Sequence, residues 1–174
     1  MTKKNNIILI GMPGAGKSIV GKELAKRLAM EFLDVDEYIE RMENKRLQEI
    51  IDEVGDNGFV EIEKKRVLEL NLSNYVISTG GSVVLKEETM EHLRKLGILV
   101  FLDISLEILK ERLTNLNTRG VVGIKSGKTI KEIFDFRQPL YRKYADLTVN
   151  FSREITLYKA VDEIIMILKN RKFV

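Results

Sequence analysis

Residues 11–18 read Gly-Met-Pro-Gly-Ala-Gly-Lys-Ser and fit the pattern G-x-x-x-x-G-K-[ST] in full. Glycines let the backbone turn tightly and aim successive N–H groups at phosphate oxygens, and the N-terminus of a following helix adds partial positive charge. In this pattern Lys17 contacts the β- and γ-phosphates of a nucleotide and Ser18 holds Mg²⁺. The alternative is an ordinary glycine-rich turn. The motif predicts a nucleotide phosphate site, but by itself it does not separate a kinase from a GTPase or a motor.

Two aspartates stand at the end of the next apolar run, Phe32-Leu33-Asp34-Val35-Asp36. Side chains two residues apart on a strand point to the same side, so we expect Asp34 and Asp36 to face the γ-phosphate together. One carboxylate can orient the magnesium shell, and the other can accept the proton of an attacking hydroxyl. The alternative is that Asp36 only caps a helix that begins at Glu37.

Two glycine-containing segments come later in the chain, one after a predicted strand and one after the predicted helix Leu106–Leu116. The first, Thr79-Gly80-Gly81-Ser82, either lets a ligand approach the main chain closely or forms a plain tight turn. The second, residues 117–128, holds three glycines and three cations. It predicts a lid that excludes water, in which Arg119 neutralises charge on a transferred phosphoryl group. A solvated surface loop is the alternative for this segment.

Two further cations flank Pro139 in Phe136-Arg137-Gln138-Pro139-Leu140-Tyr141-Arg142. Proline fits poorly inside a helix, so we expect a break or a new first turn there. A cation beside such a break can face a ligand pocket. The pattern alone does not distinguish Arg137 from Arg142 in this role.

The elements that must position these residues alternate along the chain, because short apolar strand-like runs are separated by longer helical patterns. Such alternation predicts an α/β fold with a parallel sheet covered by helices on both faces, and ligands at the carboxyl ends of the strands. The predicted strands are Ile7–Ile10, Phe32–Val35, Tyr75–Ser78, Ile98–Leu102 and Leu147–Phe151. The predicted helices are Ser18–Leu28, Glu37–Arg41, Leu47–Val54, Phe59–Leu70, Glu87–Lys95, Leu106–Leu116, Lys131–Phe136, Leu140–Tyr144 and Ile155–Lys169.

Length and composition set the class of molecule. The 174 residues suit one domain, with 44% hydrophobic and 32% charged residues. No apolar run is long enough for a membrane span, and the run 7–10 is too short for a signal-peptide core, so we expect a cytoplasmic protein. The net charge of +3 is spread along the chain, which argues against a nucleic-acid surface.

Together these segments resemble the shikimate kinase family, a branch of the nucleoside monophosphate kinase-like P-loop proteins, from Asn6 to about Leu168. The matching features are Gly-Met-Pro-Gly-Ala-Gly-Lys-Ser at 11–18, Asp34-Val35-Asp36, Ser78-Thr79-Gly80-Gly81, Asn117-Thr118-Arg119 and Arg137-Gln138-Pro139-Leu140-Tyr141.

The resemblance implies a three-layer P-loop NTPase fold in a single domain, 1–174, with a five-stranded parallel sheet in the order 2-3-1-4-5. It also implies a substrate-binding helical region at about 36–62 and a lid at about 117–130. ATP and Mg²⁺ are the implied cofactors. The ATP-binding residues would be Met12, Pro13, Gly14, Ala15, Gly16, Lys17, Ser18, Ile19, Arg112, Arg119 and Arg153. The resemblance further implies Ser18 and Asp34 at the metal, Lys17, Asp36 and Arg119 in catalysis, and Asp36, Gly80, Gly81, Ser82 and Arg137 at the substrate.

Three positions depart from the family pattern. Val60 stands where the family usually has an arginine that clamps the shikimate carboxylate, Ser82 replaces a third glycine, and Gly120 follows Arg119 in place of proline. Loss of a bidentate cation is expected to cost roughly 2–5 kcal/mol of binding if the charge pair is buried. Lys64, one helical turn after Val60, could restore part of this interaction as a point charge.

The leading interpretation is therefore an ATP-dependent kinase that converts shikimate to shikimate 3-phosphate. A family member acting on another small hydroxy acid or polyol is the nearest alternative, followed by a nucleoside or nucleotide kinase and by a non-enzymatic ATP-binding regulator. We expect a monomer that binds ATP and a small molecule, and neither nucleic acid nor a membrane.

Overall fold

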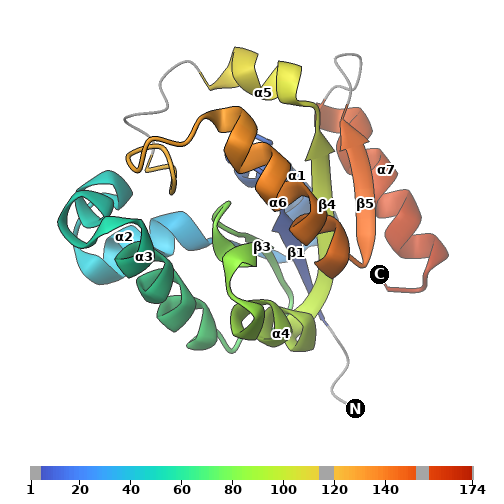
Figure 1. Ribbon diagram of the computed structural model, residues 1–174. Helices are drawn as coiled ribbons and strands as arrows, with labels where there is room; N and C mark the ends of the chain where they lie inside the picture. The colour runs from blue at the N-terminus through green and yellow to red at the C-terminus, as the bar shows by residue number, and fades with distance from the viewer. Residues whose placement is uncertain (1–4, 114–119, 152–156, 174) are drawn as a thin grey trace.

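The computed structural model describes residues 5–113, 120–151 and 157–173. Its centre is a sheet of five parallel strands in the order β2-β3-β1-β4-β5 (Figure 1), which confirms the predicted order. The strands are β1 (Asn6–Ile10), β2 (Glu31–Asp34), β3 (Tyr75–Ser78), β4 (Gly97–Ile104) and β5 (Leu147–Phe151). The helices are α1 (Lys17–Leu28), α2 (Val35–Glu43), α3 (Leu47–Leu68), α4 (Glu87–Leu96), α5 (Leu106–Arg112), α6 (Ile130–Tyr144) and α7 (Leu157–Asn170), with a 3₁₀ turn at Val83–Leu85.

Helices cover both faces of the sheet, as the alternation of elements predicts. Figure 1 shows α6 in front of the strands and α1 behind them, where α1 also packs against α7. All five residues of β1 are buried, and β4 is buried almost throughout. Strands covered on both faces are continuously apolar for this reason, and they hold the carboxyl edge of the sheet rigidly in place.

The junction of β2 and α2 differs from the prediction. The strand ends at Asp34 and the helix begins at Val35, so Asp36 lies in the first helical turn and not on a strand. Asp34 caps this helix, because its Oδ1 accepts hydrogen bonds from the N–H groups of Asp36 and Glu37 at 3.0 and 3.3 Å. The predicted alternation of two strand side chains is wrong here, and the capping residue is Asp34 and not Asp36.

Two helices are longer than predicted. The predicted helices 47–54 and 59–70 join in α3 across a kink at Gly55, whose φ of 73° is left-handed and favours glycine. The break predicted at Pro139 is wrong, since α6 runs through it from Ile130 to Tyr144. Arg137 and Tyr141, buried on either side of the proline, keep the helix in place despite the hydrogen bond that proline cannot donate.

The remaining differences lie near the undescribed segments. Helix α5 ends at Arg112, because Leu113 leaves the helical region with a ψ of 59°, whereas the prediction extended to Leu116. Helix α7 starts at Leu157. Within the described ranges, no helix combines the length and the hydropathy needed to cross a bilayer.

Candidate active site

The loop between β1 and α1 has the backbone that its glycines predict. Gly14 and Gly16 are left-handed, with φ of 81° and 92°, and a Cβ on Gly14 would stand 2.9 Å from the side chain of Leu113. The Nζ of Lys17 donates hydrogen bonds to the carbonyl oxygens of Gly11 and Met12, both at 2.9 Å. These bonds hold the ammonium group beneath the loop, where phosphate oxygens can replace the carbonyl partners.

The charge of Lys17 is set by opposing effects. Burial lowers the pKa of its ammonium group, the nearby carboxylates of Asp36 and Asp34 oppose this, and the net pKa is about 8. An anionic phosphate in the loop would favour the charged form further. The lysine therefore suits a site that neutralises phosphate charge.

Ser18 and Asp34 form a pair of oxygen donors beside this loop. The hydroxyl of Ser18 donates to Oδ2 of Asp34 and lies 3.3 Å from the hydroxyl of Ser78. Hydroxyl, carboxylate and water oxygens are the ligands that Mg²⁺ prefers, so these side chains fit the ion. The described residues contain no cluster of three acidic or histidine side chains that could hold a metal alone. This donor set suits a metal that is bound mainly by phosphate and water.

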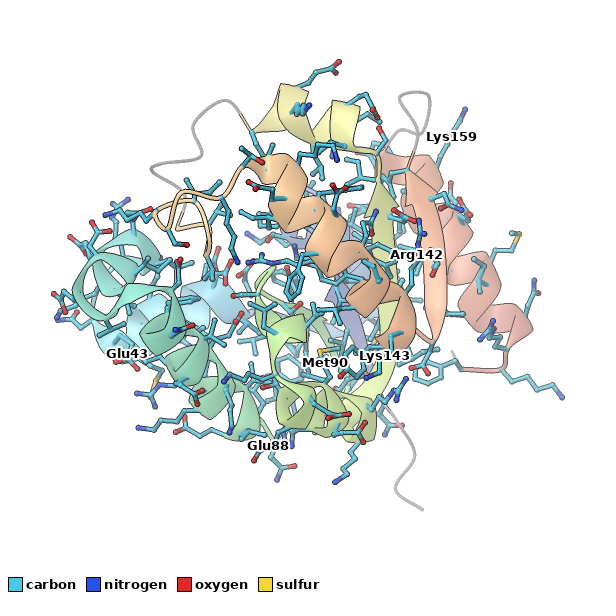
Figure 2. All side chains as sticks on the ribbon, in the orientation of Figure 1. Glu43, Glu88, Met90, Arg142, Lys143 and Lys159 are labelled. Atoms are coloured by element: carbon cyan, nitrogen blue, oxygen red, sulfur yellow. The ribbon has the colours of Figure 1, made fainter. Side chains whose placement is uncertain are left out.

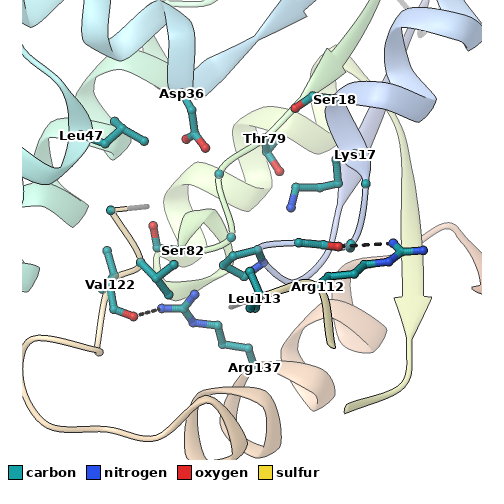
Figure 3. A pocket seen from close by; sticks show the side chains of 18 of the residues that line it. Lys17, Ser18, Asp36, Leu47, Thr79, Ser82, Arg112, Leu113, Val122 and Arg137 are labelled. Atoms are coloured by element: carbon teal, nitrogen blue, oxygen red, sulfur yellow. Dashed lines mark hydrogen bonds between the residues drawn. The ribbon is translucent and has the colours of Figure 1, made fainter. Parts of the chain in front are cut away.

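A cavity of about 630 Å³ opens at the carboxyl edge of the sheet and brings most of the predicted site residues together (Figure 3). Of these, the following line it: Pro13, Gly14, Ala15, Gly16, Lys17, Ser18, Ile19, Asp36, Gly80, Gly81, Ser82, Arg112 and Arg137. Met12 is buried and does not line the cavity. Arg119 and Arg153 lie outside the described residues.

Asp36 is the carboxylate that faces this cavity, while Asp34 lies behind it against Ser18. Burial, and to a lesser extent the charge of Asp34, raise the pKa of Asp36 against the opposing charge of Lys17, and the net pKa is about 6. A carboxylate with a pKa near the working pH is well matched to accept a proton from a hydroxyl group.

The glycines after β3 are required by close packing. A Cβ on Gly81 would stand 2.5 Å from Cδ of Pro13 in the phosphate loop. A Cβ on Gly80 would stand 2.3 Å from Oε1 of Glu63 and 2.8 Å from Oδ1 of Asp36. This strand end therefore joins the phosphate loop to the acidic side of the cavity.

Glu63 is a residue of the site that the sequence patterns did not single out. It is 1% exposed on α3, and its Oε2 accepts a hydrogen bond of 2.6 Å from the hydroxyl of Ser82. Its Oε1 is buried, and no described residue forms a hydrogen bond with it. Burial is the main cause that raises the pKa of Glu63, the Ser82 hydrogen bond opposes it and the Asp36 charge adds to it, and the net pKa is about 7. The sequence signal that could have identified Glu63 is its place at a helical spacing otherwise occupied by apolar residues, Phe59 and Val67.

The structure separates the two arginines that the pattern left equivalent. Arg137 is 3% exposed, lines the cavity, and donates a hydrogen bond of 2.9 Å from Nη2 to the carbonyl oxygen of Val122 (Figure 3). Arg142 lies on the exposed side of α6 and pairs with Asp103 at 3.0 Å (Figure 2). In the part of the chain that the structure describes, no carboxylate lies within 4.0 Å of the Arg137 guanidinium. A buried cation of this kind is suited to an anionic ligand.

Arg112 and Ile19 lie at the opposite, nucleotide side of the cavity. Arg112 donates from Nη1 to the carbonyl oxygen of Gly14 at 3.4 Å (Figure 3). Ile19 follows the loop and is 63% exposed. Both residues therefore lie beside the phosphate loop, where a nucleotide would bind.

The departures from the family pattern have structural consequences. Val60 is 6% exposed and lines a second cavity that adjoins the first. Lys64 pairs with Glu88 on α4 at 2.6 Å and lines neither cavity, so the expectation that it compensates for Val60 is wrong. Figure 2 shows Glu88 at the edge of the molecule. The ion pair with Glu88 therefore holds the Lys64 ammonium group at that edge, beside α4.

A phosphate loop after the first strand of a 2-3-1-4-5 sheet, facing a carboxylate across one cavity, defines the class of P-loop kinases. Residues 13–169 match the family model described as shikimate kinase. The chain belongs to the shikimate kinase family, whose members are kinases that use ATP with Mg²⁺.

Curated relatives fall into two groups. The chain is 36% identical over 167 residues to the shikimate kinase of Sulfurihydrogenibium sp., covering 95% of this chain and 99% of that protein. It is 37% identical over 165 residues to the threonine synthase-like 1 protein of Homo sapiens, covering 94% of this chain. The chain spans only 22% of the length of this second relative.

Solved structures agree with this assignment. The shikimate kinase of Acinetobacter baumannii, solved in complex with shikimate, superimposes with a TM-score of 0.88 at 29% identity, covering 97% of this chain and 94% of that one. A thymidylate kinase of Candida albicans, 13% identical over 98% of this chain and 93% of its own with a TM-score of 0.65, shares the fold.

Proposed function

We propose that this chain transfers the γ-phosphoryl group of ATP to a hydroxyl of a small hydroxy acid, with shikimate to shikimate 3-phosphate as the leading reaction. The observation that carries this proposal is one cavity with a phosphate loop and Asp36 at one end and, at the other, the buried guanidinium of Arg137, which has no carboxylate within 4.0 Å among the described residues. A hydroxyl and a carboxylate on one small molecule match these two ends. The complex of shikimate with the Acinetobacter baumannii kinase supports the choice of acceptor.

The residues divide the work as follows. Asp36 accepts the proton of the acceptor hydroxyl while an oxygen–phosphorus bond forms, and the bond from the γ-phosphorus to the bridging oxygen of ADP breaks. Lys17 and the loop N–H groups hold the phosphates, and Ser18 with Asp34 holds the Mg²⁺ shell, which supplies charge neutralisation when bound. Arg137 binds the carboxylate, and Gly80, Gly81 and Ser82 form the floor beneath the acceptor.

Three further assignments complete the proposal. Arg119 stabilises the transferred group, and Arg112 and Arg153 flank the adenine. We also propose that the protein acts as a monomer in the cytoplasm.

A second acceptor, another small hydroxy acid or polyol, is favoured by Val60 and Ser82. Val60 provides no second cation for a carboxylate, and Ser82 is engaged with Glu63. The acceptor side of the cavity is therefore lined by one guanidinium, Arg137, and one carboxyl group, Asp36, with Glu63 buried behind Ser82.

A coupled ADP-release assay tests both forms of the proposal. Purified protein is supplied with ATP and Mg²⁺ and with shikimate, gluconate, homoserine, a nucleoside or no acceptor, and products are checked by mass spectrometry. We expect acceptor-dependent ADP release with shikimate. Turnover of another acceptor with no shikimate phosphate would reject shikimate and leave the kinase proposal standing, whereas ADP release that no acceptor increases would reject both.

A further inference from the structure

A second cavity of about 430 Å³ lies beyond the acceptor end of the first, and the two share Val122 and Arg137. It is formed by α3, the end of the 3₁₀ turn with Lys86 after it, the segment that precedes α6, and α6 itself, which contributes Glu132. Figure 3 shows Arg137 and Val122 side by side at this boundary. Because Arg137 is buried and lines both spaces, a ligand bound to its guanidinium could extend in either direction.

The short side chain of Val60 helps to form this second space. Val60 is 6% exposed on α3 and lines the second cavity but not the first. A long side chain at this position would occupy volume that the valine leaves open. The loss of a clamp on a small acceptor and the gain of adjoining space therefore come from the same residue.

The polar groups of the second cavity have unused bonding capacity. Oδ2 of Asp56 accepts a hydrogen bond of 2.5 Å from Ser126, while its Oδ1 is shielded from solvent and has no partner among the described residues. The ammonium group of Lys128 lies 5.8 Å from the centre of the Phe136 ring, and no described carboxylate lies within 4.0 Å of it. A ligand could donate a hydrogen bond to Oδ1 of Asp56 and place an anionic group beside the ammonium group of Lys128.

We propose that the second cavity extends the acceptor site, and that the preferred acceptor is an elongated hydroxy acid. Its hydroxyl faces Asp36, a carbonyl meets Arg137, an N–H or O–H donates to Asp56, and a terminal carboxylate reaches Lys128. This inference rests on the proposed kinase function and narrows its acceptor class. Shikimate itself would fill only the first part of such a site and would leave Asp56 and Lys128 without ligand partners.

The test compares shikimate with its amide conjugate to glycine, N-shikimoylglycine, which has a carbonyl, an N–H and a terminal carboxylate in the required order. ADP release and product mass are measured for both acceptors. We expect wild-type kcat/KM to be at least about tenfold higher for the conjugate, the scale of one well-satisfied polar contact. Val60→Arg should reverse this preference, because the new side chain fills the second cavity and supplies a second cation to shikimate.

A second variant keeps the test informative if Val60→Arg fails to fold. Lys128 is exposed, so Lys128→Ala should fold, and it should lower the ratio of kcat/KM for the conjugate to that for shikimate by about fivefold, the scale of one exposed ion pair. The matched control is Lys131→Ala, an exposed lysine that pairs with Asp135 and lines neither cavity. It should leave this ratio unchanged.

The outcomes separate the two proposals. Phosphorylation of shikimate, without turnover of the conjugate or inhibition by it, would overturn the extended site and leave the kinase function standing. An unchanged acceptor ratio in Lys128→Ala would also overturn it. If neither compound nor any other acceptor stimulates ADP release, the proposed function fails and the extended site fails with it.

Discussion

At the scale of single residues, Lys17 is the side chain of the phosphate loop whose replacement should have the largest effect on phosphoryl transfer. Its ammonium group bonds to two loop carbonyl oxygens at the phosphate site. Lys17→Ala should abolish phosphoryl transfer and leave the far-ultraviolet circular dichroism spectrum unchanged. Lys22→Ala, an exposed lysine on the same helix, is the control and should keep full activity. A folded Lys17→Ala protein with wild-type turnover would contradict the phosphate-site assignment.

Asp36 tests the acceptor side of the cavity. Asp36→Asn keeps the shape of the side chain but removes the proton acceptor, so kcat should fall by about 10²-fold or more. ATP affinity, measured by calorimetry, should change little, because the proposed metal-binding pair is Asp34 and Ser18 and not Asp36. Glu37→Gln, in the same turn and exposed, serves as the control. A collapse of ATP affinity with kcat unchanged would instead assign Asp36 to the nucleotide.

At the scale of elements, the segment before α6 is docked on α3. The Gly120 N–H donates to Gln48 at 3.0 Å, Lys125 pairs with Asp52, and Ser126 bonds to Asp56. Figure 1 shows this segment beside the start of α3. The contacts join one wall of the nucleotide cavity to the helix that borders the acceptor, so closure over one ligand is expected to depend on the other.

Removing two of these contacts should loosen the segment. Each exposed contact is worth roughly 0.2–1 kcal/mol, so the double variant Gln48→Ala, Asp52→Ala should raise KM for ATP by about three- to tenfold. It should also speed trypsin cleavage after Lys125 and Lys128. The control for general destabilisation is Glu53→Ala, which also lies on α3 and removes an ion pair with Lys45, a residue outside the segment. Equal cleavage rates in the double variant and the wild type would contradict this docking.

At the scale of the whole molecule, the buried carboxyl groups of the site weaken the ligand-free fold as pH rises. Folding raises the pKa of Glu63 from 4.5 to about 7 and that of Asp36 from 3.8 to about 6. The folded state therefore binds more protons than the unfolded state in these windows, and the free energy of unfolding falls as pH rises through them. Lys17, whose pKa is lowered from 10.5 to about 8, acts in the opposite sense above pH 8.

Glu63→Gln should remove most of the fall between pH 4.5 and 7 and should raise stability at pH 7.5 relative to the wild type. Urea unfolding followed by circular dichroism across this range measures the effect. The control is Glu61→Gln on the same helix, because pairing with Lys86 lowers the pKa of Glu61 and gives it the opposite sign. If the plots of unfolding free energy against pH for Glu63→Gln and the wild type were parallel, the pKa of Glu63 would not differ between the folded and unfolded states.

The phosphate loop, the parallel sheet and the family could all be predicted from the amino-acid sequence alone. These features are local: a motif within eight residues fixes the backbone of one turn, and continuous apolar runs identify strands buried on both faces. The phosphate loop, Asp36 and the Gly80-Gly81 segment could be placed at one cavity because strand ends in a parallel sheet meet at one edge, whereas Arg112 and Arg137 followed from the family resemblance.

Contacts at the site between side chains far apart in the sequence could be identified only from the three-dimensional structure. Glu63 reaches Ser82 from α3. Arg137, which the family resemblance selected but the local pattern did not, turns inward while Arg142 stays exposed, because α6 continues through Pro139. The second cavity beside Val60 likewise exists only where α3 and α6 approach each other. Such contacts depend on the packing angle of whole elements, and no spacing within one segment encodes that angle.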